Sequence, residues 1–279
     1  MFVDLKIENV EQSIQKWSSD DVASYKARQD KVLVDLEQFL LDGNNLLDAT
    51  KIQQSVFPEI DIDVFISHSH TDEDEAIKVA LSLEEIGLKP FVDSCVWGHA
   101  DELLRKIDDA FSKPEGWTNY SYELRNRTTT NVHLILNAAL QQMIHRSELF
   151  IFLGTETSVK IDDYVSSHEQ LSSPWIFSEL TFVRNVERTL RKQITMGNES
   201  RKFEAAASDK KEVEFRYRLP DSTYAIEFWQ FARWLESGKS LPVPDFLQRV
   251  KGLEHLDRLY RELNVDASLL SAPRFDWEQ

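Results

Sequence analysis

The sequence predicts an α/β fold in which a mostly parallel sheet of four to five strands carries helices on both faces. Most of the chain shows apolar residues at helical spacing, and short runs with the two-residue period of a strand interrupt this pattern. Strands that alternate with helices predict a parallel sheet, because parallel neighbours need long crossover connections. The 279 residues suffice for one large domain or two modest ones.

Residues 1–57 are predicted to form an N-terminal helical extension. Val10, Ile14 and Trp17 recur at helical spacing, and a second apolar series ends at the stop signal that begins with Gly43. We therefore expect this segment to flank the sheet.

Three strands are predicted at 60–66, 88–92 and 149–153. In the first, isoleucine and valine alternate with aspartate, and the third is apolar throughout, as in a strand buried on both faces. The helices expected around them lie at 72–86, 101–111, 132–144 and 175–190. Ser173 followed by Pro174 marks the start of the last of these helices.

The C-terminal part is predicted to contain one more strand and then only helices. Residues 213–219 alternate between apolar and charged side chains, which predicts a fourth strand. Helical patterns at 224–235 and 245–263 make 221–279 a C-terminal helical region.

Charge excludes two classes of partner. The chain has 32 Lys and Arg against 48 Asp and Glu, a net charge of −16. This field repels phosphate backbones, so we expect neither nucleic acid nor a membrane as partner. The N-terminus lacks the pattern of a signal peptide and no apolar run approaches the length of a membrane span, so we expect a cytoplasmic protein.

Two short motifs have plain structural explanations. His68 and His70 precede the acidic run 72–75, but negative charge is favourable at the helix N-terminus expected there, so no metal is predicted. The run Gly238-Lys239-Ser240 lacks the first glycine of a P-loop, because Arg233 occupies that position. We interpret it as a helix end.

Four separated pieces of sequence carry a family resemblance. They are Asp63-Val-Phe-Ile-Ser-His-Ser69, Phe91-Val-Asp93, Asp101-x-Leu103 and Ser173-x-Trp-x-x-x-Glu179. In this order they resemble the Toll/interleukin-1 receptor (TIR) domain, especially bacterial forms that begin with the same first piece. The resemblance covers about 61–217 and implies a flavodoxin-like sheet. It assigns a TIR domain to 58–220, with insertions at about 112–131 and 156–172.

The resemblance also implies an activity. In enzymatic TIR domains the glutamate of the Trp-x-x-x-Glu piece is the catalytic residue of an NAD glycohydrolase, and Glu179 matches it. Nicotinamide leaves as a neutral amine, and a carboxylate stabilises the oxocarbenium-like ribosyl centre. NAD is then a substrate, and no cofactor is expected. The alternative is that Glu179 is an ordinary solvated helix residue.

Three polar residues at strand ends are candidates for binding the substrate. Ser67 and His68 end the first strand and Asp93 ends the second, where parallel sheets bind ligands. By resemblance Ser67 and His68 line the nucleotide pocket, and Asp93 is a candidate to bind ribose hydroxyls. His68 equally fits a surface position, and Asp93 equally fits a loop cap.

Four further candidates each have an alternative structural role. Trp97, in the loop expected after 88–92, stacks on adenine or on a second subunit. Trp175 lies one helical turn before Glu179, where it either packs in the core or stacks on ligand. Arg125 and Arg127 pair either with a pyrophosphate or with surface carboxylates.

The expected function is therefore an NAD glycohydrolase or cyclase in anti-phage defence, which passes a cyclic ADP-ribose-type messenger to a separate effector. A non-catalytic TIR scaffold acting by self-association and an enzyme similar to nucleoside deoxyribosyltransferases are the alternatives. The run Ala100-Asp-Glu-Leu103 departs from the Gly-Asp-Ser-Leu common in the family, which puts assembly through that loop in doubt. The second insertion, which leads into the Glu179 helix, is expected to act as a lid.

Overall fold

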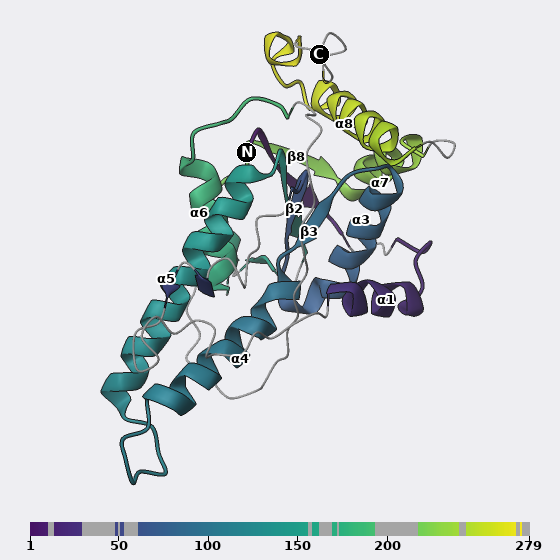
Figure 1. The fold of residues 1–279 in the computed structure, drawn as a ribbon. Helices are drawn as coiled ribbons and strands as arrows, with labels where there is room; N and C mark the ends of the chain where they lie inside the picture. The colour runs from purple at the N-terminus through teal and green to yellow at the C-terminus, as the bar shows by residue number, and fades with distance from the viewer. Residues whose placement is uncertain are drawn as a thin grey trace.

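The chain forms an α/β fold around a five-stranded, all-parallel sheet of flavodoxin-like topology, which confirms the predicted fold class (Figure 1). The computed structural model describes residues 1–10, 14–29, 48–49, 51–52, 61–155, 158–161, 169–171, 173–192, 217–239, 244–271 and 274. The strand order is β3-β2-β4-β1-β8. The strands are β1 (Val3–Glu8), β2 (Val64–Ser67), β3 (Pro90–Val92), β4 (Leu149–Gly154) and β8 (Tyr224–Glu227).

Three of these strands are the ones that the sequence predicts most clearly. The chain runs from β2 outward to β3 and then returns to place β4 on the other side of β2. Helix α3 (Glu73–Glu85) makes the first crossover, and helices α4 (Ser94–Phe111) and α5 (Tyr122–Arg146) make the second. The direction of winding reverses at β2 and β4, and in such sheets ligands bind at the carboxyl ends of the strands beside this point.

The helical extension expected over 1–57 is wrong for its first residues, because Val3–Glu8 is strand β1. Val3, Leu5 and Ile7 alternate with charged side chains and are buried, the period of a strand. β1 lies between β4 and β8, with Leu5 opposite both Ile151 and Tyr224. Helix α1 (Ser19–Gln29) does follow in this segment.

The C-terminal part also contributes to the sheet, contrary to the expectation of helices alone. Tyr224–Glu227, expected to begin a helix, is edge strand β8, and helix α7 (Phe228–Ser237) starts directly after it. Glu227 and Gln230 form the capping box that marks this start. Helix α8 (Asp245–Glu262), as expected, and a short 3-10 helix at Ala267–Leu270 follow.

The predicted fourth strand does not join the parallel sheet. Of residues 213–219, Tyr217–Arg218 form β7, which pairs with β6 (Glu169–Leu171) in a small antiparallel sheet completed by β5 (Lys160–Ile161). Residues 211–216 lie outside the described part of the chain. In the parallel sheet, β1 and β8 lie beyond β4.

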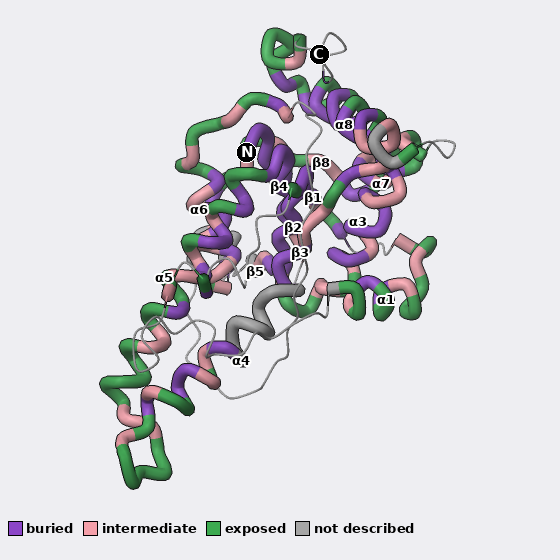
Figure 2. The backbone as a smooth tube through the Cα atoms, in the orientation of Figure 1, coloured by how far each residue is buried: buried purple, intermediate pink, exposed green. Residues whose placement is uncertain are grey.

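Helices α4 and α5 form an arm that projects from the body of the molecule. The loop expected after β3 is absent, because α4 begins at Ser94. Helix α5 begins at Tyr122, so the first expected insertion (112–131) is largely helical and only 112–121 connect the two helices. Figure 2 shows that the far end of the arm is mostly exposed.

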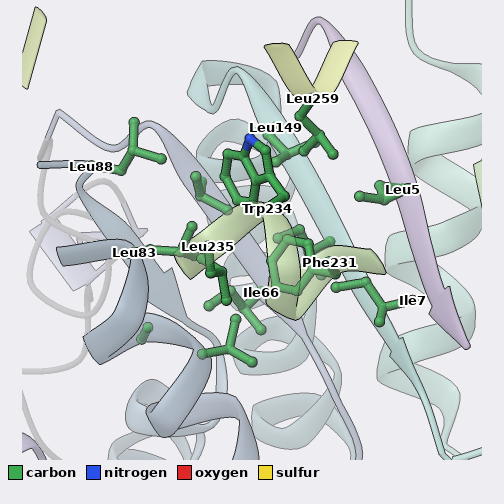
Figure 3. Packing of buried hydrophobic residues seen from close by; sticks show 14 of the residues in the cluster. Leu5, Ile7, Ile66, Leu83, Leu88, Leu149, Phe231, Trp234, Leu235 and Leu259 are labelled. Carbon is green, nitrogen blue, oxygen red and sulfur yellow. The ribbon is translucent and has the colours of Figure 1, made fainter. Parts of the chain in front are cut away.

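Each face of the sheet has its own core. Helices α1, α3, α7 and α8 cover one face, and α4, α5 and α6 (Pro174–Asn185) cover the other. Strand β4 serves both cores, because Leu149 and Ile151 point to the first and Phe150 to the second. In Figure 3 Phe231 and Trp234 of α7 pack among leucine and isoleucine side chains of the first core.

Buried ion pairs fasten the C-terminal part to the amino end of β4. Arg274 contacts both carboxylate oxygens of Glu148, at 2.5 and 2.7 Å, and also contacts Asp257 of α8. Arg191 binds the other oxygen of Asp257, and Tyr260 donates a hydrogen bond to Glu148. The charges compensate one another, as buried charges must. This network therefore lies at the amino ends of the parallel strands, opposite to the carboxyl ends, where such sheets bind ligands.

Candidate active site

Four residues from three separated pieces of sequence meet at the carboxyl ends of β2 and β3. Ser67 ends β2, His68 follows it, and Asp93 follows β3. The two strands are parallel neighbours with Ile66 opposite Val92, so their ends lie at the same edge of the sheet. Glu179 of α6 faces this edge, where Asp93 and Ser67 are its interacting neighbours.

Helix α6 is positioned by its first turn and by α5. Ser173 caps the helix by accepting a hydrogen bond from the Ile176 amide at 3.3 Å, and Pro174 occupies the first helical position, as the sequence predicts. Ser178 donates to Asn137 of α5 at 2.7 Å. These contacts turn the next residue, Glu179, toward the sheet.

Glu179 is a buried carboxyl group, which excludes the alternative that it is a solvated helix residue. It is 1% exposed. Burial raises the pKa of Glu179 well above its usual value, and the negative charge of Asp93 raises it further, whereas the Ser67 hydroxyl opposes the shift. In this environment Glu179 keeps its proton at pH values where an exposed glutamate is ionised.

His68 and Asp93 form a buried pair beside Glu179. Nδ1 of His68 lies 2.7 Å from Oδ1 of Asp93, and neither side chain is more than 4% exposed. Burial by itself lowers the pKa of His68, but Asp93, with Glu73 and Asp72 as further acidic neighbours, outweighs it and leaves the pKa raised. His68 is buried, so the alternative that it is a surface residue is wrong. The Asp93 side chain makes no cap hydrogen bond, so the alternative that it caps the loop is wrong as well.

The site contains an unusual number of buried polar atoms without a well-aligned hydrogen bond to any described residue. They are Ser67 Oγ, His68 Nδ1 and Nε2, Asp93 Oδ1, Ser94 Oγ, and Oε1 and Oε2 of Glu179. The contact between His68 and Asp93 is therefore an ion pair whose atoms are not aligned as in a hydrogen bond. Buried polar groups in folded proteins are nearly always paired, so this cluster marks a place suited to a polar ligand.

Sequence reasoning missed Ser94 and the closeness of Asp93 to Glu179. Ser94 directly follows Asp93 at the end of a strand, a position that signals a ligand site in parallel sheets. The pairing of Asp93 with Glu179 had no such signal, because it depends on how α6 docks against the sheet.

Neither tryptophan is seen to contribute to this cluster. Trp97 lies on helix α4 and not in the expected loop, and its side chain is outside the described part of the structure. Trp175 is half-buried and meets the ring of His133 on α5 edge-on, with the ring centroids 5.3 Å apart. Trp175 therefore packs against α5, and its stacking on a ligand stays a prediction.

Arg125 and Arg127 lie near the start of α5, and this end of the helix lies on the projecting arm (Figure 1). Arg125 pairs with Asp108 of α4 at 3.3 Å and lies over the ring of Tyr120. Arg127 is exposed. Arg125 thus pairs with a carboxylate of the protein, and pairing of either arginine with a pyrophosphate stays a prediction.

The loops after β2 and β4 are joined near the site. Thr155 donates a hydrogen bond of 2.5 Å to Asp72, which also accepts one from Ser69. In the described part of the chain, no three His, Cys, Asp or Glu side chains are placed to hold a metal ion. The expected lid, 156–172, includes 162–168, which lie outside the described residues, so lid closure stays a prediction.

Comparison with known proteins adds no family: no family model matches the chain, and neither a curated protein nor a solved structure was found to be similar. The described helices include none that is both long and apolar enough to cross a membrane. The class of the protein therefore follows from its fold and its site alone. It is a parallel α/β protein with a buried His-Asp-Glu cluster at the carboxyl ends of its strands.

Proposed function

We propose that the protein is a TIR-type NAD glycohydrolase with Glu179 as the catalytic carboxylate. The observation that carries this proposal is the convergence of Ser67, His68 and Asp93 on a buried Glu179. Sequence analysis names each of these four residues as a candidate, and Ser67 and Glu179 lie 112 positions apart in the chain. A helix glutamate with only a structural role has no need of such neighbours.

The proposed reaction breaks the bond between C1′ of the ribose and the nicotinamide nitrogen. The bonding electrons leave with nicotinamide, and the ribosyl centre acquires positive charge that the Glu179 carboxylate stabilises. The Ser67 hydroxyl, which has no aligned hydrogen bond to a described residue, is suited to bind a ribose hydroxyl. Attack by water yields ADP-ribose and a proton, whereas attack by a nitrogen of the adenine yields a cyclic product.

The raised pKa of Glu179 gives this mechanism a defined pH dependence. Only the carboxylate form stabilises a cation, and burial and Asp93 favour the protonated form. kcat/KM is therefore expected to rise with pH through the raised pKa of Glu179 in the free protein, at higher pH than an ordinary glutamate would give.

Incubation of the purified, concentrated protein with NAD tests the proposal. Chromatography should show nicotinamide together with ADP-ribose or a cyclic form of it. The setting inferred from the resemblance, anti-phage defence through a messenger for a separate effector, requires the cyclic product. If NAD stays intact in every assembly state, the glycohydrolase is refuted and the non-catalytic TIR scaffold is favoured.

The carboxyl group of Asp93 supports one other candidate function, that of an enzyme similar to nucleoside deoxyribosyltransferases. Such chemistry needs a carboxylate to capture the sugar and an acid to protonate the leaving base. Asp93 lies beside Glu179 and raises the pKa of Glu179, so the site holds two neighbouring carboxyl groups for these two roles. Release of a free base from deoxynucleosides, with NAD left intact, would decide for this candidate.

A further inference from the structure

We propose that the His68-Asp93-Glu179 cluster selects ligands whose ring beside Glu179 is positively charged, and that Glu179 releases a proton when such a ligand binds. This inference rests on the proposed function, and it specifies which form of the nucleotide the site takes. The ligand class is a cationic N-riboside, of which the pyridinium ring of oxidised NAD is an example. His68 and Asp93 are positioning residues that act on Glu179.

The first step of the argument is the order of the three groups. The imidazole of His68 is 2.7 Å from the Asp93 carboxylate, and Asp93 in turn is the main acidic neighbour of Glu179. All three side chains are buried, so each charge is felt strongly by the next group. The protonation state of each group therefore depends on the charges of its neighbours in the cluster.

The second step is the charge of that unit before a ligand binds. Asp93, Glu73 and Asp72 are the acidic groups that face His68, and they favour the imidazolium. Among the described residues, Asp93 and Ser67 are the groups that act on Glu179, and Asp93 favours its protonated form. The three members of the cluster, an imidazolium, a carboxylate and a neutral carboxyl, add up to no net charge. Asp72 and Glu73 are only half-buried, so solvent screens their charges.

The third step is the effect of a cation placed beside Glu179. A neutral cluster does not compensate an added positive charge in a buried site, and the penalty for an uncompensated charge is large. The carboxyl of Glu179 restores the balance by giving its proton to the solvent and becoming a carboxylate. Glu179 then carries the negative charge that the proposed reaction needs.

The fourth step is the discrimination that follows. A ligand with a neutral ring, such as a reduced dinucleotide, gives Glu179 no reason to ionise, so its binding releases no proton. For the cationic ligand, affinity is coupled to proton release. Its Kd is expected to fall by up to about tenfold per pH unit between the bound-state and free-state pKa values of Glu179.

The first experiment measures Glu179 without any ligand. Infrared spectra of the wild-type protein minus those of Glu179→Gln isolate the protonated carboxyl band, which is followed as the pH rises. Asp93→Asn removes the neighbouring negative charge, so the band should disappear at lower pH than in the wild type. His68→Gln removes the positive charge beside Asp93, so the band should persist to higher pH. An unchanged band in both variants overturns the roles of His68 and Asp93.

The second experiment needs only the wild-type protein. Calorimetry in two buffers of different ionisation enthalpy counts the protons released by carba-NAD, which is cationic and uncleavable. Benzamide adenine dinucleotide, which has a neutral ring, is the matched control. About one proton should be released by the first compound and none by the second. Equal proton release by both compounds overturns the inference.

The outcomes separate this inference from the proposed function. If NAD is cleaved in a reaction that depends on Glu179 but carba-NAD binds without proton release, the inference alone is wrong. If neither dinucleotide binds, the proposed function is wrong and the assignment of the ligand is wrong with it. In that case the infrared titration still reports whether His68 and Asp93 set the ionisation of Glu179.

Discussion

Replacing Glu179 by glutamine is expected to stabilise the protein, and more so as the pH rises. The raised pKa means that the folded state holds a proton that the unfolded state loses near pH 4.5, the ordinary value for glutamate. The stability contributed by this protonated group is fully present below pH 4.5 and is lost as the pH rises toward the folded-state pKa. Glutamine has the same shape and does not ionise, so the variant avoids the loss.

The size of the effect follows from linkage. One proton held by the folded state alone changes the free energy of unfolding by about 1.4 kcal/mol per pH unit. With Glu179 1% exposed, solvent screens little of this effect. The stability difference between Glu179→Gln and the wild type should therefore grow by about this amount per unit above pH 4.5, until the folded-state pKa is reached.

Urea unfolding followed by tryptophan fluorescence, repeated from pH 4.5 upward, measures this difference. Glu187→Gln is the matched control, because Glu187 is exposed just beyond the end of α6. The control should follow the wild type at every pH. A difference between Glu179→Gln and the wild type that stays constant with pH would refute the argument that Glu179 is protonated in the folded protein.

Three further outcomes are expected. A fragment of residues 58–220 lacks β1 and β8 and should show no cooperative unfolding, whereas a stable monomeric fragment would contradict the role given to these strands. Arg274→Met leaves buried Glu148 and Asp257 short of a cation and should lower the free energy of unfolding by about 3 to 5 kcal/mol. A loss below about 1 kcal/mol, measured by urea unfolding, would mean that the network is not important for stability. Arg127→Gln, on the projecting arm, should leave nicotinamide release unchanged. A large loss of activity would show that Arg127 contributes to the site.

The central half of the fold could be predicted from the sequence because its signals are local. Strands β2, β3 and β4 each show a clear apolar pattern between helices, and parallel topology then brings their carboxyl ends together. For this reason the amino-acid pattern alone is enough to group Ser67, His68 and Asp93. The start of α6 is equally local, since Ser173 and Pro174 define it.

The two outer strands could not be predicted in the same way. β1 owes its position to pairing with β4, whose residues lie about 146 positions further along the chain, as in Val3 opposite Leu149. β8 has four residues and runs directly into α7 without a break in the apolar pattern, which by itself favours a helix over the whole stretch. In both cases tertiary contacts decide between helix and strand.

The burial of Glu179 was also beyond sequence reasoning. The Trp-x-x-x-Glu spacing places Trp175 and Glu179 on one face of a helix, but it does not say which of them meets the sheet edge. The docking of α6 on α5 decides this, with Trp175 against His133 and Glu179 beside Asp93.

The rate of nicotinamide release by Glu179→Gln, compared with the wild type and with Glu187→Gln, tests the central claim most directly. Loss of one preorganised electrostatic group at a reacting centre typically lowers turnover about 100 to 1,000-fold. We expect that loss in Glu179→Gln and wild-type release in Glu187→Gln. Release of nicotinamide from NAD by Glu179→Gln at the wild-type rate would contradict the assignment of Glu179 as the catalytic carboxylate.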